Sequence, residues 1–415
     1  ERHPIDLDVG PDEGSPGGCR HVACQESHPS TRYRRARMTT PAADDRTDPD
    51  ADHHADGAAD ERIELIVLFG GQSAEHDVSC TTAAHVLRAA DPAKYRITPI
   101  GIGRDGTWAL ATGATAALDA GPDALPGCLD PGGASVSPTE IVSRRSAGTT
   151  VVMPLLHGPM GEDGTVQGLL ELANVPYVGS GVLASALAMD KAMAKQVLSA
   201  NGIPQARYRA VRESGITPGL AQQLADELGL PVFVKPANMG SSVGVSKAKT
   251  VEAIRDAISI ALTYDEWVVV EEAITGREIE VAVLGNLDPR ASLPGEIVPG
   301  AEFYDYADKY LDDGSTCVIP AGLSTAATAE VQRLAVQVFR TLRCEGMARV
   351  DFFYEDRPGG RGWLCNEANT IPGFTPISMY PKMWIASGLS YSALIDELVR
   401  LAVERHGRQR RNTAR

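Results

Sequence analysis

The sequence lacks any long apolar run. No stretch of its 415 residues approaches the roughly 18 consecutive apolar residues that a membrane-spanning helix needs. Its first residues lack the charged stretch and the apolar region of a secretory signal. Its seven cysteines are odd in number and widely scattered, which argues against a disulfide framework and favours a reduced protein. We therefore expect a cytoplasmic protein without membrane contact.

Positive charge is also in short supply. The chain has 39 Lys and Arg residues against 54 Asp and Glu residues, a formal net charge of −15. A nucleic-acid-binding surface is therefore not expected. An acidic protein can still hold a local cationic pocket, so the net charge does not exclude a nucleotide substrate. The chain is long enough for two or three domains.

The beginning of the chain lacks sustained apolar periodicity. Residues 1–61 are rich in Asp, Ala, Pro, Gly, Arg and His, and they cannot bury enough surface to offset the entropy of ordering them. We predict a disordered extension, within which Met38 is a candidate native start. Four potential zinc ligands occur there, Cys19, His21, Cys24 and His28. Their spacing fits no compact zinc finger, and an incidental tail is the simpler interpretation.

Apolar strands alternate with helices after residue 61. The first part predicts strands at residues 63–69, 95–102, 107–111 and 149–156, and helices at residues 79–89 and 165–173. This alternation is typical of a parallel sheet covered by helices. A second part predicts helices at residues 190–200 and 251–262 and strands at residues 231–235, 240–247 and 267–272. A third part predicts strands at residues 278–284, 348–354 and 362–366 and helices at residues 326–342 and 392–404.

One motif is misleading. The sequence GIGRDG at residues 101–106 matches the G-x-G-x-x-G fingerprint of dinucleotide sites. That fingerprint needs a helix after the glycines, so that the helix N-terminus meets a pyrophosphate. The residues that follow are typical of a returning strand, so we predict a hairpin turn instead.

Polar clusters follow two predicted strands of the first part. Glu75 lies in GGQSAEHDVS at residues 70–79 and could pair with an ammonium group, although a capping cluster for the next helix is an alternative. His157 begins HGPMGEDG at residues 157–164 and could contact a substrate or phosphate, although a structural histidine is an alternative.

Two lysines suggest a phosphate site. Lys235 ends an apolar strand, where an inward lysine needs a partner, and Lys191 precedes it in the chain. The sequence GSSVG at residues 240–244 could close backbone N–H groups on phosphate oxygens. It is not a Walker A loop, because G-K-[ST] is absent, and an ordinary hairpin is an alternative.

The strongest chemical signal comes from two strands of the third part. Alternation along one strand places Arg349 and Asp351 on the same face, and Glu367 and Asn369 share a face on the next. Hard oxygen ligands beside a cationic group suit Mg²⁺ bridged by phosphates. The alternative is a structural salt bridge between Arg349 and a carboxylate.

Taken together, these motifs resemble the D-alanine–D-alanine ligase family of the ATP-grasp superfamily over about residues 62–405. The matching stretches also include MDK at residues 189–191, VKP at residues 234–236, EEAITGREIE at residues 271–280, FYDYADKY at residues 303–310 and NEANTIPGFTPISMYP at residues 366–381. Agreement in order and spacing across so many motifs is specific to the family.

The resemblance implies an α/β fold, with α+β character in the ATP-binding part. Five segments follow from it: a disordered extension (1–61), an N-terminal parallel-sheet substrate domain (62–182), a central ATP-grasp subdomain (183–272), a C-terminal ATP-grasp subdomain with the metal site (273–405) and a basic tail (406–415). ATP would lie between the two subdomains.

The resemblance also implies roles for particular residues. Glu75 would hold the ammonium group of the first D-alanine in a hydrogen-bonded group with Ser241 and Tyr310, and His157 would lie beside that substrate. The phosphates would be held by Lys191, Lys235 and Lys309, with Ser242 nearby in the Gly/Ser loop. Glu271 and Ile274 would line the adenine site, and Glu278 would bind the ribose. The metal ligands would be Asp351, Glu367 and Asn369. Arg349 and the N–H of Gly373 would form the oxyanion site, and Ser378 and Met379 would meet the second substrate's carboxylate.

The implied reaction is the joining of two D-alanines at the expense of ATP, through a D-alanyl phosphate, to supply a bacterial cell-wall precursor. Two Mg²⁺ ions, with Mn²⁺ as a substitute, and a homodimer are implied. Residues 302–315 would form a lid over the site, and their intact pattern favours the dipeptide over an ester product. Glu272 stands where some relatives carry Lys, which we interpret as variation within the family. The alternatives are a D-Ala-D-Lac or D-Ala-D-Ser ligase and a nucleotide-binding regulator that has lost catalysis.

Overall fold

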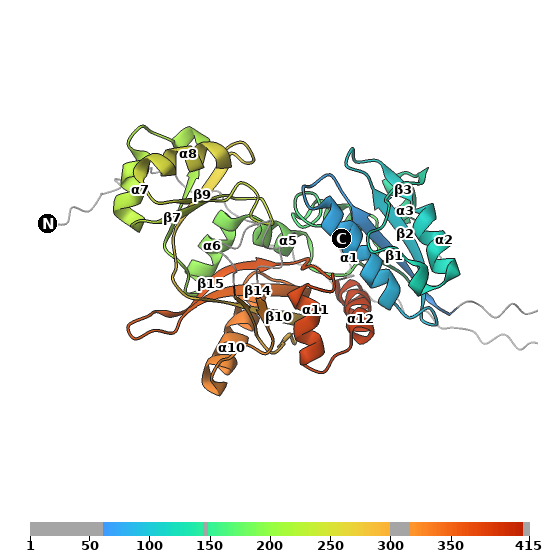
Figure 1. Cartoon of the computed structure of the whole chain (residues 1–415). Coiled ribbons are helices and arrows are strands. Elements are labelled where there is room, and N and C mark those ends of the chain that lie inside the picture. Colours follow the sequence, from blue (N-terminus) through green and yellow to red (C-terminus); the bar gives the residue numbers. More distant parts are fainter. Residues whose placement is uncertain (1–60, 144–147, 299–315, 410–415) are drawn as a thin grey trace, which may run out of the picture. The chain divides into compact units, whose positions relative to one another are not determined.

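The computed structural model describes residues 61–143, 148–298 and 316–409, although not the side chains of residues 142 and 143. These residues belong to one compact unit, which holds three β-sheets (Figure 1). The predicted extension at residues 1–60, with its zinc alternative and Met38, lies outside the described residues. So do the whole predicted lid, residues 302–315 with Lys309 and Tyr310, and residues 410–415 of the tail.

The first sheet has the strand order β4-β3-β2-β1-β5. Strands β1 (Ile63–Gly70), β2 (Tyr95–Ile102) and β5 (Thr150–Pro154) are mutually parallel, as predicted. β3 (Trp108–Leu110) and β4 (Ala134–Ser135) are antiparallel to their neighbours, and β3 is the returning strand that the sequence predicts after residue 106. β2 returns directly into β3 through a turn in which the N–H of Gly103 donates to the carbonyl of Thr107 at 2.8 Å. The hairpin predicted for residues 101–106 is thereby confirmed.

Helices surround this sheet. They are α1 (His76–Ala89), α2 (Thr112–Ala120), the short 3₁₀ turn η1 (Pro122–Ala124), α3 (Pro138–Ser143) and α4 (Thr165–Leu172). The sequence predicted α1 and α4, but α1 begins three residues earlier than expected, directly after Glu75. This earlier start places Glu75 at the junction of the β1 loop and the helix, which fixes its backbone beside the strand end.

The second sheet is antiparallel, with the order β6-β9-β7-β8. Its strands are β6 (Tyr208–Arg212), β7 (Val232–Pro236), β8 (Ser246–Ala248) and β9 (Trp267–Glu272). The 3₁₀ turn η2 (Glu213–Gly215) follows β6, and α7 (Leu220–Leu228) and α8 (Val251–Ala261) pack on the sheet through a buried aliphatic core (Figure 1). Before this sheet come α5 (Val182–Met189) and α6 (Lys191–Ala200). The carboxylate of Asp190 caps α6 by accepting the N–H of Met193 at 3.0 Å.

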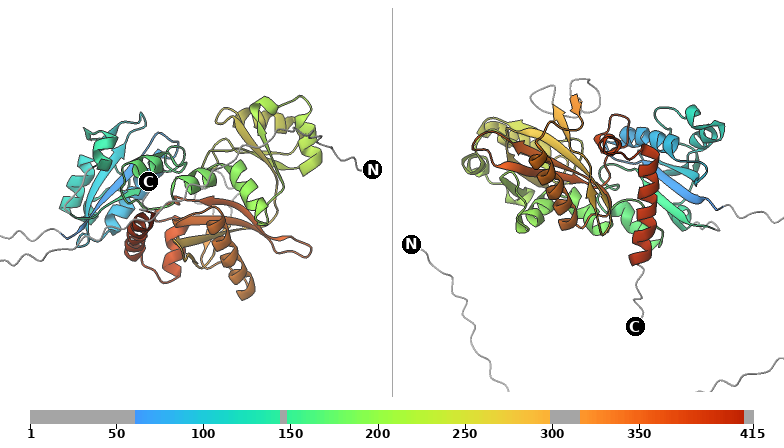
Figure 2. Two further views of the ribbon diagram at one scale, coloured as in Figure 1. Left: turned by 180° about the vertical axis from the view of Figure 1, so that it is seen from behind. Right: turned by 90° about the horizontal axis from the view of Figure 1, so that it is seen from below.

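The third sheet is also antiparallel, with the order β13-β12-β10-β14-β15 and β11 paired with β10. Its strands are β10 (Arg277–Gly285), β11 (Arg290–Ala291), β12 (Gly295–Val298), β13 (Thr316–Val318), β14 (Gly346–Glu355) and β15 (Gly362–Asn369). β15 extends three residues beyond its predicted end, so Glu367 and Asn369 lie on the strand itself. The helix α10 (Thr325–Thr341) packs against β10 and β14 (Figures 1 and 2).

The last helices are α11 (Met379–Ala386) and α12 (Tyr391–Gln409). α12 continues past Glu404, where the predicted helix ends, so residues 406–409 are helical rather than part of a frayed tail. The extra turn is anchored by its own contacts: Arg405 is buried with its guanidinium 4.0 Å from the Tyr177 ring centre, and Arg408 pairs with Glu345. No helix among the described residues is long and apolar enough to cross a membrane.

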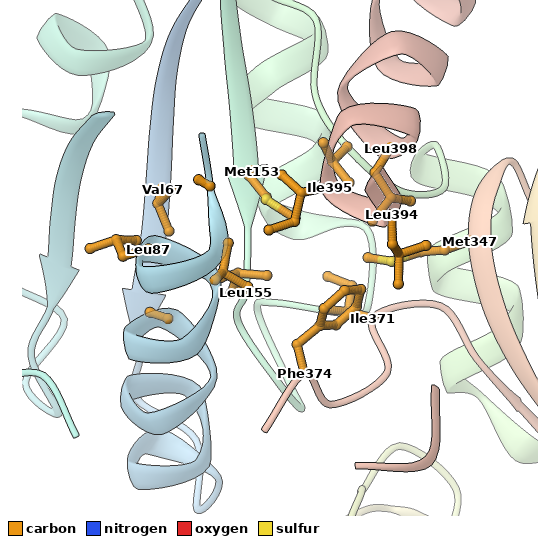
Figure 3. Packing of buried hydrophobic residues seen from close by; sticks show 14 of the residues in the cluster. Val67, Leu87, Met153, Leu155, Met347, Ile371, Phe374, Leu394, Ile395 and Leu398 are labelled. Carbon is orange, nitrogen blue, oxygen red and sulfur yellow. The ribbon is translucent and has the colours of Figure 1, made fainter. Parts of the chain in front are cut away.

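One buried cluster joins the first sheet to the third. Val67 and Met153 of the first sheet belong to the same cluster as Ile371 and Phe374, which follow β15, and Leu394 of α12 (Figure 3). Burial of each such side chain stabilises the fold by about 1.5–3 kcal/mol. The cluster therefore holds the carboxyl ends of β1 and β5 beside the end of β15, where the polar motifs lie.

Candidate active site

A cavity of about 670 Å³ is lined by residues that follow strands of the first sheet and by residues of the second and third sheets. Its volume lies within the range of small-molecule sites. Most of the predicted site residues line it: Glu75, His157, Lys191, Lys235, Ser241, Ser242, Glu271, Ile274, Glu278, Arg349, Glu367, Asn369, Gly373, Ser378 and Met379. Asp351 does not line the cavity, but it accepts hydrogen bonds from Arg349 and Asn369, which do. Segments separated by up to about 300 residues thus meet at one place.

Glu75 points into this cavity. It occupies the N-cap position of α1, yet its carboxylate accepts no hydrogen bond from the helix, and it accepts one from the hydroxyl of Ser241 instead. The capping alternative is therefore not what the structure shows for Glu75. The carboxylate is 93% buried, and Gly240 and Gly158 approach it so closely that an added Cβ would lie 2.6 and 2.9 Å from its Oε2.

His157 links the first sheet to the segment after β15. Its Nδ1 lies 3.0 Å from the carbonyl of Ile371, and its Nε2 lies 3.3 Å from the hydroxyl of Thr82. Burial would lower the His157 pKa, but Glu162 and Glu75 outweigh it, and the pKa is raised. Both ring nitrogens thus have protein partners, which is what the structural alternative expects. The predicted contact with a substrate stays a prediction.

Two lysines contact one buried carboxylate on the central sheet, and a third, Lys191, lies nearby. Glu271 lies 3.0 Å from the Nζ of Lys235 and 3.3 Å from the Nζ of Lys195. Burial would raise the Glu271 pKa, but the two lysines outweigh it and hold the pKa at about 2. Lys191 donates to the carbonyl of Met239 at 2.5 Å, and its pKa is lowered, first by burial. The cluster carries more positive than negative charge and faces the cavity through Lys191 and Lys235.

The Gly/Ser loop beside these lysines has an unusual backbone. Ser241 and Ser242 have φ values of +48° and +60°, in the left-handed region that side chains other than glycine rarely adopt. Such conformations cost about 1–3 kcal/mol each and persist where the surroundings enforce them, often at ligand sites. Here the hydrogen bond from Ser241 to Glu75 is one such constraint. The loop connects β7 to β8, which pair antiparallel, so the hairpin alternative from the sequence is present in the structure with a long connection.

Carboxylates line up across the third sheet. Glu280 on β10 is directly opposite Asp351 on β14, which is directly opposite Glu367 on β15. Arg349 binds both oxygens of Asp351, at 2.8 and 2.7 Å, and its Nε lies 3.1 Å from Glu280. Burial opposes the charge of Arg349, but Asp351 and Glu280 outweigh it and raise the Arg349 pKa. The salt-bridge alternative from the sequence is therefore present in the structure.

The same region could hold a divalent cation. Asp351 and Glu367 are neighbours across the strands, and the amide of Asn369 donates to Asp351 at 3.1 Å. Two carboxylates and an amide oxygen are donors that Mg²⁺ accepts, with phosphate oxygens completing its shell. Within the described ranges, no three His, Cys, Asp or Glu side chains are arranged to hold a metal ion. These donors therefore fit Mg²⁺ bound together with a phosphate rather than by protein alone.

The loop after β15 closes the far end of the cavity. Ser378 precedes α11, and its hydroxyl accepts the N–H of Thr375 at 3.0 Å. A Cβ added to Gly373 would lie 2.7 Å from the same hydroxyl oxygen, so a larger residue there would displace the Ser378 side chain. Glycine leaves the backbone N–H of residue 373 accessible, as its predicted oxyanion role needs.

Glu272, where some relatives carry Lys, forms ion pairs with two arginines near the predicted adenine site. It lies 2.9 Å from Arg207 and 2.6 Å from Arg361 of the β14–β15 connection. Burial would raise the Glu272 pKa, but these arginines outweigh it, and the pKa is lowered. A lysine there would face two arginines, so the local charges explain a glutamate in this chain.

Sequence reasoning missed two buried charges. Lys195 lies four residues after Lys191, one helical turn along the same face of α6, and Glu280 lies two residues after Glu278 on the same face of β10. Both spacings were visible in the sequence. Their partners, Glu271 and Arg349, lie on other elements and depend on the tertiary fold.

Comparison with known protein families shows which family the chain belongs to. The family model "D-ala D-ala ligase N-terminus" matches residues 64–180, and "D-ala D-ala ligase C-terminus" matches residues 197–400. The chain belongs to the D-alanine–D-alanine ligase family. The resemblance inferred from the motifs is thereby confirmed.

Individual members of the D-alanine–D-alanine ligase family agree with this assignment. A D-alanine–D-alanine ligase of Arthrobacter sp. (strain FB24) is 48% identical, covering 85% of this chain and 97% of that protein. One from Paenarthrobacter aurescens is 46% identical, covering 83% and 96%. Among solved structures, the D-alanine-D-alanine ligase from Coxiella burnetii has a TM-score of 0.71 at 41% identity, covering 84% and 96%. VanG D-Ala:D-Ser ligase from Enterococcus faecalis has a TM-score of 0.70 at 36% identity, covering 82% and 99%.

Proposed function

We infer that the protein is a D-alanine–D-alanine ligase, which converts ATP and two D-alanines into D-alanyl-D-alanine, ADP and phosphate for cell-wall precursor synthesis. The observation that carries this inference is the meeting of the family's separated motifs around one cavity, with lysines on one side and carboxylates on the other. A nucleotide-binding regulator without catalysis would not need Arg349 beside the carboxylate row.

ATP would lie between the central part, residues 183–272, and the C-terminal part, residues 273–405. Glu278 would bind the ribose, and Glu271 and Ile274 would line the adenine site. The phosphates would face Lys191, Lys235 and the strained loop that contains Ser242. Lys191 and Lys235 both line the cavity, and their positive charges match the negative charge of a triphosphate.

The first step would form D-alanyl phosphate. Glu75, oriented by Ser241, would hold the ammonium group of the first D-alanine, with His157 beside it. The carboxylate of this D-alanine would attack the γ-phosphate while Lys191 and Lys235 stabilise the developing charge. Phosphoryl transfer depends mainly on such positioning and electrostatics. Mg²⁺ held by Asp351, Glu367 and Asn369 would supply further charge neutralisation at the phosphates. Two ions, replaceable by Mn²⁺, are expected from the family.

The second step would form the peptide bond. The amino group of the second D-alanine attacks the activated carbonyl and displaces phosphate. Arg349 and the N–H of Gly373 would stabilise the oxyanion, a contact worth about 3–4 kcal/mol in comparable sites. Ser378 and Met379, at the start of α11, would bind the second carboxylate, where backbone N–H groups at a helix N-terminus favour an anion.

The test is product analysis with purified protein, ATP and Mg²⁺. With D-alanine we expect D-alanyl-D-alanine and equal amounts of ADP and phosphate, and with L-alanine alone we expect neither. ATP hydrolysis without a dipeptide would reject the proposal.

A D-Ala-D-Ser ligase is the second candidate, because the VanG D-Ala:D-Ser ligase structure is similar over nearly its whole length. Competition between D-alanine, D-serine and D-lactate as second substrates, at neutral and raised pH, distinguishes these products. A cytoplasmic homodimer is the expected form, which analytical ultracentrifugation would check.

A further inference from the structure

Glu280 is a buried carboxylate to which the expected site assigns no role. It lies on β10, is 92% buried and lines the cavity. Its Oε2 lies 3.1 Å from the Nε of Arg349 on the neighbouring strand. A buried carboxylate is costly unless it has a cationic partner, and Arg349 is such a partner for Glu280.

The register of the sheet creates a charge problem at this point. Glu280, Asp351 and Glu367 occupy directly opposite positions on three adjacent strands, and like charges in such positions repel. Arg349, two residues from Asp351 on the same strand, contacts two members of the row. Lys191 and Lys235 also attract Glu367 electrostatically. A divalent cation at Asp351 and Glu367 would add positive charge where three carboxylates lie side by side.

Asp351 has two partners in this arrangement, Arg349 and the predicted metal ion. Both of its oxygens accept hydrogen bonds from Arg349, and the same oxygens are predicted metal ligands. A metal ion and the guanidinium therefore compete for Asp351. When Asp351 turns to the metal, Arg349 loses its two-bond partner and needs another contact to keep its orientation.

We propose that Glu280 is a positioning residue that retains Arg349 when a divalent cation engages Asp351. This role rests on the proposed ligase function and deepens it. The single N–H of the Arg349 Nε donates to Asp351 in this structure, and Glu280 lies beside it as a second acceptor that this N–H can take when Asp351 turns to the metal. Without Glu280, a metal ion that takes Asp351 leaves the guanidinium without this second carboxylate.

The first test measures metal affinity rather than activity. Mn²⁺ binding to the full-length protein with ADP is followed by electron paramagnetic resonance for native protein and Glu280→Gln, and again in an Arg349→Met background. We expect Glu280→Gln to weaken Mn²⁺ binding at least fivefold when Arg349 is present and less than twofold when it is absent. Equal weakening in both backgrounds would mean that Glu280 acts on the metal through its charge alone, and would overturn the proposal.

The second test compares activity with a matched ion pair. Glu296 on β12 binds Arg277 at 2.7 and 2.6 Å in the same sheet, and neither residue lines the cavity. Glu280→Gln should lower kcat at least tenfold and raise the Mg²⁺ concentration for half-maximal rate, whereas Glu296→Gln should change both less than threefold. Equal effects of the two substitutions would contradict a positioning role.

A variant that keeps the charge guards against a folding failure. Glu280→Asp retains the carboxylate but withdraws it from Arg349 by one methylene, so it should also weaken Mn²⁺ binding. Native Mn²⁺ affinity in a folded Glu280→Asp protein would overturn the proposal. The Mn²⁺ measurements do not depend on which product the native protein makes. Failure of the native protein to form a dipeptide would reject the ligase function separately.

Discussion

The central and the third sheet bury opposite excesses of charge on the two sides of one cavity. On the central side, Lys195 and Lys235 share the single carboxylate of Glu271. On the other side, Arg349 serves both Glu280 and Asp351. Buried charges normally occur in matched pairs, because unmatched ones are strongly destabilising. The mismatch indicates that each side binds a further group of opposite charge. A nucleotide phosphate would satisfy the lysines, and a divalent cation would satisfy the carboxylates.

We expect the largest loss of activity from substitution of Arg349 on the third sheet. Arg349→Met removes the positive charge from the carboxylate row and the predicted oxyanion donor, so kcat should fall roughly 10²–10³-fold. Steady-state kinetics on the folded variant measure this loss. The matched control is Arg277→Met, which breaks an ion pair of the same sheet outside the cavity. Its kcat should change less than about threefold, and a comparable loss in both variants would remove the special role of Arg349.

The central side is tested through the pH dependence of stability. The Glu271 pKa is lowered from 4.5 to about 2, so the folded state binds fewer protons than the unfolded state. Its contribution, on the order of 3 kcal/mol, is present above about pH 4.5 and is lost as the pH falls towards 2. Urea unfolding should show Glu271→Gln destabilised by about this amount at pH 7 and less dependent on pH below 4.5.

The matched control for this experiment is Glu227→Gln. Glu227 pairs with Arg209 at 3.1 Å, but both side chains are about half exposed. Exposed ion pairs contribute only about 0–1 kcal/mol. If Glu227→Gln and Glu271→Gln cost the same, the buried cluster has no special energetic role.

The proposed phosphate-binding role of Lys235 predicts a loss of ADP affinity that is smaller than the loss of kcat at Arg349. Lys235→Met should weaken ADP binding roughly 10–100-fold, since a charge-assisted bond is worth about 1.5–3 kcal/mol. Isothermal titration calorimetry measures the change. Lys249→Met, at an exposed lysine just beyond β8, provides the control and should bind ADP as the native protein does. Unchanged ADP affinity in Lys235→Met would place the phosphates elsewhere.

The smallest effect concerns the first substrate. A Cβ at residue 240 would lie 2.6 Å from Oε2 of Glu75, so Gly240→Ala should displace that carboxylate. The KM of the first D-alanine should rise about 3–10-fold while ADP affinity stays constant. Gly168→Ala, where a Cβ would meet nothing within 4 Å, should leave both constants unchanged. A rise in ADP Kd with an unchanged D-alanine KM would contradict the role given to Glu75.

Local patterns in the sequence were enough to predict most strands, whereas several residues of the cavity, such as Glu278, Ser378 and Met379, were predicted only through the resemblance to the family. The strand at residues 267–272 matches β9 at both ends, because its apolar run is continuous and buried. The helix α7 was missed, because it is short and is preceded by Pro and Gly. The apolar pattern alone ended the last predicted strand at residue 366, whereas β15 continues to Asn369, where the alternation had placed Glu367 and Asn369.

Partnerships between elements could not be predicted in the same way. That Glu280 faces Asp351 depends on the register of β10 against β14, and a shift of one residue would turn one of the two side chains to the other face. That Glu271 takes Lys195 as a second partner depends on how α6 packs beside β9. Sequence spacing fixes which residues share a face, whereas tertiary packing fixes which charges meet.

A crystal structure with Mg²⁺ and ADP tests the central claim most directly. The account predicts phosphate oxygens against Lys191 and Lys235, and a metal ion bound by Asp351, Glu367 and Asn369, with Arg349 still on Glu280. A nucleotide bound outside the cavity, or phosphates directed away from both the lysines and the carboxylate row, would contradict it.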